Sequence, residues 1–153
     1  MQLLNQTYVK YALMQCAALI LCLTLMEVTG NNLTFEQKPI FQVIFVMITP
    51  FIIWFLGIRA KKAELKNKMS FKQGFNEGFK ISVVFGILSV FIFLVYYLFI
   101  NTFIIESVKF VYGMPDGSNS AVIAIDLITQ FLSSIIFGSL YSAIIAFILK
   151  SKN

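Results

Sequence analysis

Four long runs of apolar residues, separated by shorter polar segments, constrain the fold of this chain more than any other feature of its sequence. The runs cover residues 8–28, 39–58, 81–100 and 121–149. Each has about 20 residues or more, the number that an α-helix needs to cross a hydrocarbon core of about 30 Å. The sequence therefore predicts an all-α fold, an integral membrane bundle of four antiparallel transmembrane helices that forms a single domain over residues 1–153.

The composition also indicates a fold embedded in the lipid bilayer. Hydrophobic residues make up 59% of the 153 residues and charged residues 12%, whereas soluble domains have roughly 45–50% and 25%. A soluble fold this small has too much surface to bury so many apolar side chains. Cys16 and Cys22 lie within the first run, and we interpret them as small buried hydrophobic residues.

The basic residues predict how the chain is oriented. If both termini lie on one side of the membrane, ten of the twelve Lys and Arg residues fall on that side, seven of them in the segment 59–80. Cytoplasmic loops carry an excess of Lys and Arg, so we predict cytoplasmic termini, a cytoplasmic loop 59–80, and outer loops 29–38 and 101–120. Because these charges flank apolar runs rather than interleave with aromatic residues on a polar surface, we expect no nucleic-acid partner.

Two side chains near the ends of the apolar runs are expected at the membrane interface. Trp54 lies about one turn before Arg59, a position typical of the aromatic belt. Glu27 ends the first run, where a long charged side chain can reach toward the headgroups.

The segment before the third run has an amphipathic helical pattern. Three phenylalanines recur at every fourth residue, and two glycines recur at the same spacing. Ser70 and Gln73, at its start, have the spacing of a capping box. We predict an amphipathic helix that lies in the inner interface as an elbow before the third span, with a docking surface for a partner or an acidic lipid as the alternative. The residues of this interfacial elbow are Phe71, Gly74, Phe75, Gly78 and Phe79.

Polar and small residues recur at every fourth position along the fourth run. Small residues at this spacing let two helices pack backbone to backbone, with hydroxyl groups that bond across the interface. We predict a helix-packing face in the inner part of this run, with a pore or substrate face as the alternative. The residues of this face are Ser134, Gly138, Ser142 and Ala146.

Asp126 is the one acidic residue embedded in the fourth run. If about 20 residues of helix before Leu149 fill the hydrocarbon core, the core ends near Gln130, and Asp126 lies roughly 6 Å farther out. This depth favours a helix-start or interfacial role, with an ion or proton relay as the alternative. Asp126, Gln130 and Tyr141 are the polar side chains of this run that we expect to line any cavity.

Groups that catalyse reactions or bind metals are scarce in this sequence. It contains no His, no phosphate-binding Gly-rich loop and no metal-ligand spacing, and its serines have no evident partner base. We therefore predict a protein that is not an enzyme and needs no cofactor, acting through helix–helix assembly with itself or with a membrane-protein partner. The alternative is a small transport or channel subunit that uses the polar groups of the fourth span.

The middle of the chain resembles a known family. The run Trp54-Phe-Leu-Gly-Ile-Arg59, the segment Met69-Ser-Phe-Lys-Gln-Gly-Phe-Asn-Glu-Gly-Phe79 and the stretch Tyr97-Leu-Phe-Ile-Asn101 are similar to the bacterial four-helix membrane proteins grouped as the domain of unknown function DUF4199. Two positions depart from its pattern: Thr102 stands where a Pro often follows the Asn, and Ala12 where a Gly-like residue is expected. The resemblance implies a multi-pass protein of a bacterial inner membrane and carries no activity.

Overall fold

All the secondary structure in the described part of the chain is helical, which confirms the predicted all-α class. The computed structural model describes residues 6–28, 40–101 and 104–151, and within the second helix the side chains are described from Met47 onward. The elements are α1 (Thr7–Val28), α2 (Ile40–Glu64), α3 (Phe71–Val95), a π-helical turn η3 (Tyr96–Ile100), α4 (Ile104–Val111) and α5 (Asn119–Leu149).

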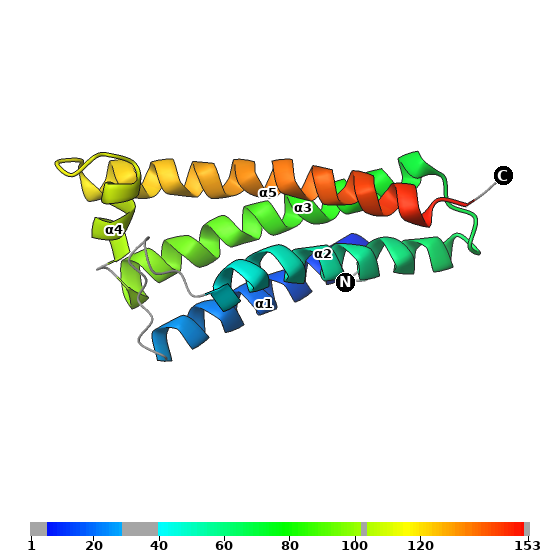
Figure 1. Cartoon of the computed structure of the whole chain (residues 1–153), viewed down its shortest axis with the longest axis horizontal. Helices are drawn as coiled ribbons and strands as arrows, with labels where there is room; N and C mark the ends of the chain where they lie inside the picture. Colours follow the sequence, from blue (N-terminus) through cyan, green and yellow to red (C-terminus); the bar gives the residue numbers. More distant parts are fainter. Residues whose placement is uncertain (1–5, 29–39, 102–103, 152–153) are drawn as a thin grey trace.

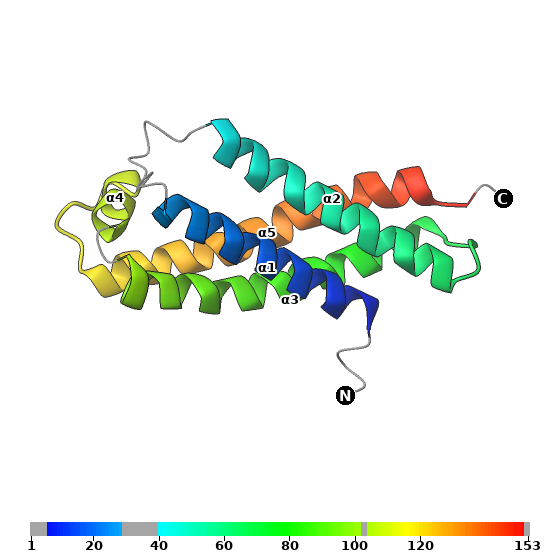
Figure 2. The ribbon, with the colours of Figure 1, turned by 90° about the horizontal axis from the view of Figure 1, so that it is seen from below.

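The four long helices lie roughly along one axis, and the short helix α4 lies across one end (Figure 1). The α2–α3 connection and the C-terminus lie together at the opposite end (Figures 1 and 2). The most extensive contact joins α3 and α5, and α1 and α2 pack on this pair and on each other. The long outer loop predicted at 29–38 lies outside the described residues.

Three helices of the described chain are long and apolar enough to cross a membrane: α1, α5 and the continuous helix formed by α3 and η3. Their outward faces carry large exposed hydrophobic side chains, such as Phe91, Ile136 and Phe147, which are 61%, 65% and 63% exposed. Exposed apolar surface on this scale indicates contact with lipid. The second predicted span, over residues 39–58, includes positions outside the described side chains and stays a prediction.

The central polar segment is mostly helical, so the predictions of a loop over 59–80 and of a separate helix before the third span are wrong. α2 continues to Glu64 and α3 begins at Phe71, which leaves only residues 65–70 as the connection. The predicted capping box is confirmed: the Gln73 N–H donates to the Ser70 hydroxyl at 3.3 Å, and the Ser70 N–H donates to the Gln73 Oε1 at 2.8 Å. This cap starts α3 directly, and packing against α5 holds the helix together across its two early glycines.

The connection between α2 and α3 is tied to the end of α5. The Ser151 N–H donates to the Met69 carbonyl at 2.9 Å, and the Ser151 hydroxyl donates to the Asn67 carbonyl at 2.7 Å. Lys66 and Asn67 have φ values of 52° and 62°, the left-handed region that ends helices and makes tight turns. Residues far apart in the sequence thus close one end of the bundle together.

Small residues at a four-residue step let α3 and α5 approach closely. Along the seam, residue numbers rise on α3 as they fall on α5. A Cβ added to Gly78 would lie 2.2 Å from the Ser142 Oγ, and one added to Gly138 would lie 2.0 Å from the Ser82 Oγ. The facing pairs are Gly74 with Ala146, Gly78 with Ser142, Ser82 with Gly138, and Gly86 with Ser134.

The seam therefore places the candidate helix-packing face of α5 against α3 of the same chain. Its hydroxyls bond back along their own helices: Ser142 donates to the Gly138 carbonyl at 2.5 Å, and Ser82 donates to the Gly78 carbonyl at 3.0 Å. The expectation that hydroxyls bond across the seam is wrong for these residues, because a serine in a helix can reach the carbonyl one turn earlier.

Trp54 lies inside the bundle, which corrects its expected place in an aromatic belt. It is 2% exposed, its Nε1–H donates to the Ser82 hydroxyl at 3.1 Å, and its ring meets the Phe85 ring edge-to-face at 6.0 Å. A buried Trp needs such a partner for its N–H. The buried hydrophobic cluster around it consists of Ala12, Ile53, Trp54, Ile58, Met69, Ile81 and Ile145.

Candidate functional site

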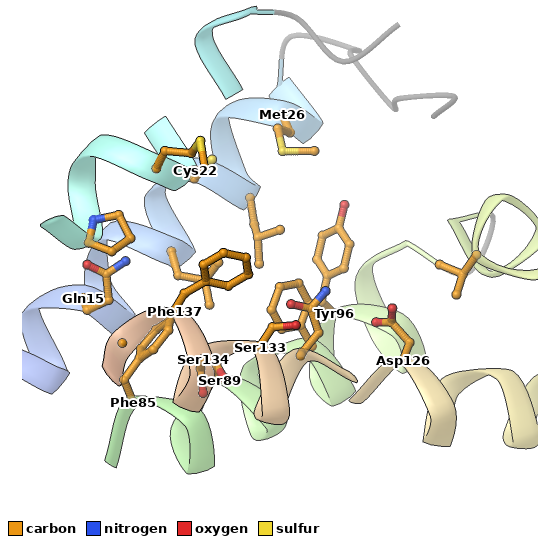
Figure 3. Close-up of a pocket in the computed structure, with 18 of the residues that line it drawn as sticks. Gln15, Cys22, Met26, Phe85, Ser89, Tyr96, Asp126, Ser133, Ser134 and Phe137 are labelled. Carbon is orange, nitrogen blue, oxygen red and sulfur yellow. The ribbon is translucent and has the colours of Figure 1, made fainter. Parts of the chain in front are cut away.

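A cavity of about 610 Å³ lies among the helices, toward the end of the bundle where α4 lies. Side chains of α1, α2, α3, α4 and α5 all line it, and Figure 3 shows part of its wall with Gln15 on one side and Asp126 on the other. The structure describes 25 residues that line it, of which eight are aromatic and none is Lys or Arg. Cys22 lines this cavity, and both cysteines are buried and free, as predicted.

Asp126 lies at the centre of a group of hydrogen bonds in the site. It is 7% exposed and accepts two hydrogen bonds, from the Tyr97 hydroxyl to its Oδ2 at 2.5 Å and from the Tyr112 hydroxyl to its Oδ1 at 3.0 Å. Burial raises the pKa of Tyr112, which keeps this hydroxyl protonated as a donor. The helix-start role expected for Asp126 is wrong, because Ser118 caps α5 and Asp126 lies about two turns inside the helix.

A second carboxylate, Glu27 at the end of α1, accepts a hydrogen bond from a different tyrosine. The Tyr96 hydroxyl donates to the Glu27 Oε1, and the Asn101 Nδ2 donates to the same oxygen at 2.7 Å. The Asn101 Oδ1 in turn accepts the Ile104 N–H at 3.1 Å. This group of side chains joins α1 to the end of η3 and to the first residue of α4.

Two consecutive tyrosines of the π-helical turn η3 donate hydrogen bonds to two different carboxylates. The Asn101 N–H donates to the Tyr96 carbonyl at 2.9 Å, a spacing of five residues instead of the four of an α-helix. Turns of this kind occur frequently at functional sites. Tyr96 bonds to a residue of α1 and Tyr97 to a residue of α5, so the turn links three helices through hydroxyl groups.

All three residues of the candidate polar site, Asp126, Gln130 and Tyr141, line the cavity, although they form no single cluster. Tyr141 is 15 residues after Asp126, about 22 Å along a helix. Its hydroxyl donates to the Met47 carbonyl at 3.4 Å, and its ring meets the Phe51 ring edge-to-face at 5.9 Å. Of the three, only Asp126 belongs to the group of hydrogen bonds with Tyr97 and Tyr112.

The residues of the predicted elbow divide between two faces of α3. The Phe75 ring stacks on the Phe71 ring at 6.1 Å and on the Phe79 ring at 6.2 Å, so the predicted phenylalanine stripe is present. Gly74 and Gly78 are buried against α5 instead. The elbow residues therefore lie away from the cavity, and its two glycines belong to the helix seam.

Several residues of the site were not singled out from the sequence. Gln15 is 5% exposed and lines the cavity. Among the described residues, its Oε1 and the Glu77 Oε1 are the buried side-chain oxygens without a hydrogen-bond partner. The sequence held two signals for these residues. Gln15 is an amide in the middle of the first apolar run, and Tyr96 and Tyr97 are consecutive tyrosines near the end of the third. In the described ranges, no three His, Cys, Asp or Glu side chains come together as metal ligands.

Comparisons with known proteins agree with the resemblance noted in the sequence. The family model described as "Protein of unknown function (DUF4199)" matches residues 10–151. No curated protein and no solved structure matches the chain. Since the family match includes nearly all of its 153 residues, the chain belongs to the DUF4199 family of proteins of unknown function.

Proposed function

We propose that this protein is a non-catalytic membrane protein that holds a small amphiphilic molecule inside its helical bundle. The observation that carries the proposal is the cavity of about 610 Å³ with a buried Asp126 in its wall. Sites for small molecules have volumes of roughly 300–1,000 Å³, with mostly apolar walls and a few placed polar groups. The apolar part of the ligand lies against the aromatic walls, and its polar head lies near Asp126.

This proposal develops the hypothesis of a transport or channel subunit, because binding within the bundle is the first step of carrying a molecule across. Asp126 and Gln130, two polar groups of the fourth apolar run, both line the cavity. Assembly with a second copy or a partner remains a proposal, although the small-residue face now supports packing within one chain. Measuring the mass of the purified protein in a mild detergent tests this assembly. A mass equal to that of one chain, with no other protein bound, would contradict it.

We further propose that the chain crosses a bacterial inner membrane four times, as antiparallel spans with both termini in the cytoplasm. Ten of its twelve Lys and Arg residues support this orientation. The C-terminus and the α2–α3 connection lie at the same end of the molecule, as such a topology requires (Figure 1). The absence of His and of any motif for a cofactor in the sequence supports a role without catalysis.

The only Trp of the chain provides a direct test of the cavity, because Trp54 lines it and is 2% exposed. A neutral brominated amphiphile, 10-bromo-1-decanol, quenches indole fluorescence on contact. Titrated into the purified protein, it is expected to quench Trp54 to a saturable level. Bulk detergent carrying the same bromine would quench in proportion to concentration without saturation.

Two variants of α5 complete this test. Ser133 lines the cavity, so Ser133→Phe fills part of it and is expected to abolish the saturable quenching. Ile136 is 65% exposed on the outer face, so Ile136→Phe adds an aromatic ring away from the cavity and is expected to leave the quenching unchanged. If the quenching of Trp54 in the unmodified protein rises linearly with bromodecanol concentration, with the same slope as in the Ser133→Phe variant, the proposal is refuted.

A further inference from the structure

The charges and aromatic rings of the cavity specify the kind of molecule that fits it. We infer that its ligand is a lipophilic organic cation, whose positive centre lies beside the Asp126 carboxylate. The inference rests on the proposed function, because it concerns the ligand of the same cavity.

The described wall of the cavity contains an acidic residue and no basic one. Among the described residues that line it, Asp126 is the only acidic one and none is Lys or Arg. The two ion pairs in the described part of the chain join Lys61 to Glu64 at 2.8 Å and Lys109 to Glu106 at 2.9 Å. Asp126 therefore has no cationic partner within the described chain. A carboxylate held within a membrane is costly without a partner of opposite charge, so we expect the ligand to bring a positive charge.

A buried amide, that of Gln15, lines the cavity at a second position. Gln15 is 5% exposed, and its Oε1 has no hydrogen-bond partner. Figure 3 shows the Gln15 side chain on the side of the cavity away from Asp126. A buried acceptor without a partner favours a ligand that carries donors or positive charge.

Aromatic rings surround the end of the cavity that holds Asp126. Phe93, Tyr96, Tyr97 and Tyr112 line the cavity, and the hydroxyls of Tyr97 and Tyr112 donate to Asp126. The face of an aromatic ring attracts a cation, by about 0.5–1 kcal/mol at exposed sites and about 2 kcal/mol or more where water is excluded. A carboxylate among aromatic rings is therefore a site for a cation whose substituents are apolar.

Tetraphenylphosphonium and tetraphenylborate test the inference, because the two ions have nearly the same size and shape and opposite charges. Their binding is measured by equilibrium dialysis with the protein in nanodiscs of zwitterionic lipid, after subtraction of the amount taken up by nanodiscs without protein. We expect saturable binding of tetraphenylphosphonium, at one ion per chain, and no saturable binding of tetraphenylborate. Equal binding of both ions would overturn the inference without any variant.

Variants at two acidic positions then locate the charge. Asp126→Asn keeps the size and the acceptor oxygen of the side chain and is expected to weaken phosphonium binding about tenfold or more, whereas Asp126→Glu retains binding. Glu106→Gln removes one negative charge from α4 outside the cavity wall and is expected to change nothing. Unchanged affinity of Asp126→Asn would overturn the inference.

The neutral bromodecanol separates this inference from the proposed function. If bromodecanol quenches Trp54 to saturation while tetraphenylphosphonium shows no saturable binding, the cavity binds amphiphiles and the inference about charge is wrong. If neither compound shows saturable binding, the proposed function fails together with the inference.

Discussion

At the scale of single residues, the Asp126 carboxylate depends on two hydroxyl groups that come from different segments. The Tyr97 hydroxyl, from η3, lies 2.5 Å from it, and the Tyr112 hydroxyl, just after α4, lies 3.0 Å from it. Hydrogen bonds to a charged group contribute more than neutral ones, about 1.5–3 kcal/mol. These two bonds therefore hold α5 to two separate segments that precede it in the sequence.

Replacing Tyr97 with Phe removes one of these hydroxyls and little else. We expect Tyr97→Phe to lower the free energy of unfolding by about 1–3 kcal/mol, because a buried carboxylate loses a donor. Titration with SDS, followed by the fluorescence of Trp54, measures this change. Tyr141→Phe is the matched control, since its hydroxyl donates to the Met47 carbonyl at 3.4 Å and not to a carboxylate of the described residues. An equal loss in both variants would contradict the assigned role of Tyr97.

Gly78 tests the seam between α3 and α5. An added Cβ would lie 2.2 Å from the Ser142 Oγ and 2.7 Å from its Cβ, so Gly78→Ala is expected to cost about 1–3 kcal/mol through overpacking. The double variant Gly78→Ala with Ser142→Gly moves the side chain to the other helix and should recover part of that loss in the same SDS titration. A double variant no more stable than Gly78→Ala alone would show that this contact is not the cause.

At the scale of elements, the π-helical turn η3 sets the rotation of everything that follows it. A single extra residue within a helical turn rotates the later part of the chain by about 100° relative to a continuous α-helix. This rotation brings Asn101 beside Glu27, where its Nδ2 lies 2.7 Å from the carboxylate, and lets its Oδ1 accept the Ile104 N–H. The turn thus orients α4 over the end of the cavity.

Deleting Phe99 is the direct test of this role, because its side chain is 78% exposed. The deletion removes the extra residue, restores an α-helical turn and rotates Asn101 away from Glu27. We expect it to lower the free energy of unfolding by more than about 1 kcal/mol, whereas Phe99→Ala stays within about 0.5 kcal/mol, as surface substitutions do. SDS titration compares the two variants, and equal stabilities would argue against the importance of the turn.

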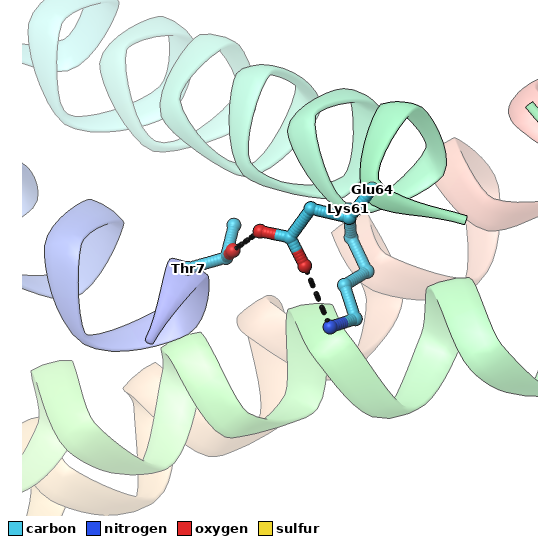
Figure 4. A network of polar contacts seen from close by, with 3 residues as sticks. All are labelled: Thr7, Lys61 and Glu64. Carbon is cyan, nitrogen blue, oxygen red and sulfur yellow. Dashed lines mark hydrogen bonds and ion pairs between the residues drawn. The ribbon is translucent and has the colours of Figure 1, made fainter. Parts of the chain in front are cut away.

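A polar contact outside the apolar runs ties the start of α1 to the end of α2 (Figure 4). Both the Lys61 ammonium, at 2.8 Å, and the Thr7 hydroxyl donate to the Glu64 carboxylate. The hydrogen bond from Lys61, followed by that from Thr7, lowers the pKa of Glu64 below its ordinary value of 4.5. A lowered pKa means that the contact stabilises the fold above the ordinary value and is lost as the pH falls through the lowered one.

The Glu64→Gln variant measures this contribution and its pH dependence. At pH 7 we expect it to be less stable than the unmodified protein by less than about 1 kcal/mol, because the Glu64 side chain is 49% exposed. The difference should vanish as the pH falls through the lowered pKa of Glu64, where the carboxylate becomes protonated. SDS titrations at the two pH values check this, and a difference that grows at low pH would have the wrong sign.

At the scale of the whole molecule, the bundle is closely packed at one end and hollow at the other. Buried Ile58, Met69 and Ile145, together with the contacts of Gly74 and Gly78 with α5, close the end near the C-terminus. The cavity of about 610 Å³ occupies the end near α4. We expect the closed end to face the cytoplasm, because most of the basic residues lie there, and the hollow end to face outward.

Labelling of single cysteines with a membrane-impermeant maleimide tests this orientation. Cys16 and Cys22, which are 6% and 4% exposed, are first replaced with Ala. Lys66→Cys, in the α2–α3 connection, is expected to react only after the cells are lysed, and Asp116→Cys, between α4 and α5, is expected to react in intact cells. Reaction of Lys66→Cys in intact cells would reverse the proposed topology.

By itself, the sequence determined that the chain forms long apolar helices and how some of them begin and end. Hydropathy and the capping box at Ser70 are local properties, so α1, the start of α3 and most of α5 follow from them. The family resemblance was equally visible in the residues of the middle segment. The helix-packing face of α5 could also be predicted from the four-residue spacing of its small residues, because a helix repeats nearly every four residues.

Only the tertiary structure decided what these faces meet. It placed the small residues of α5 against α3 of the same chain, buried Trp54 inside the bundle, and joined Asp126 to Tyr97 and Tyr112. The physical reason is that these contacts join residues from different helices, whose distances depend on how the helices pack and on the extra residue in η3. No local pattern of side chains encodes those distances, and the cavity exists only where the packed helices leave space.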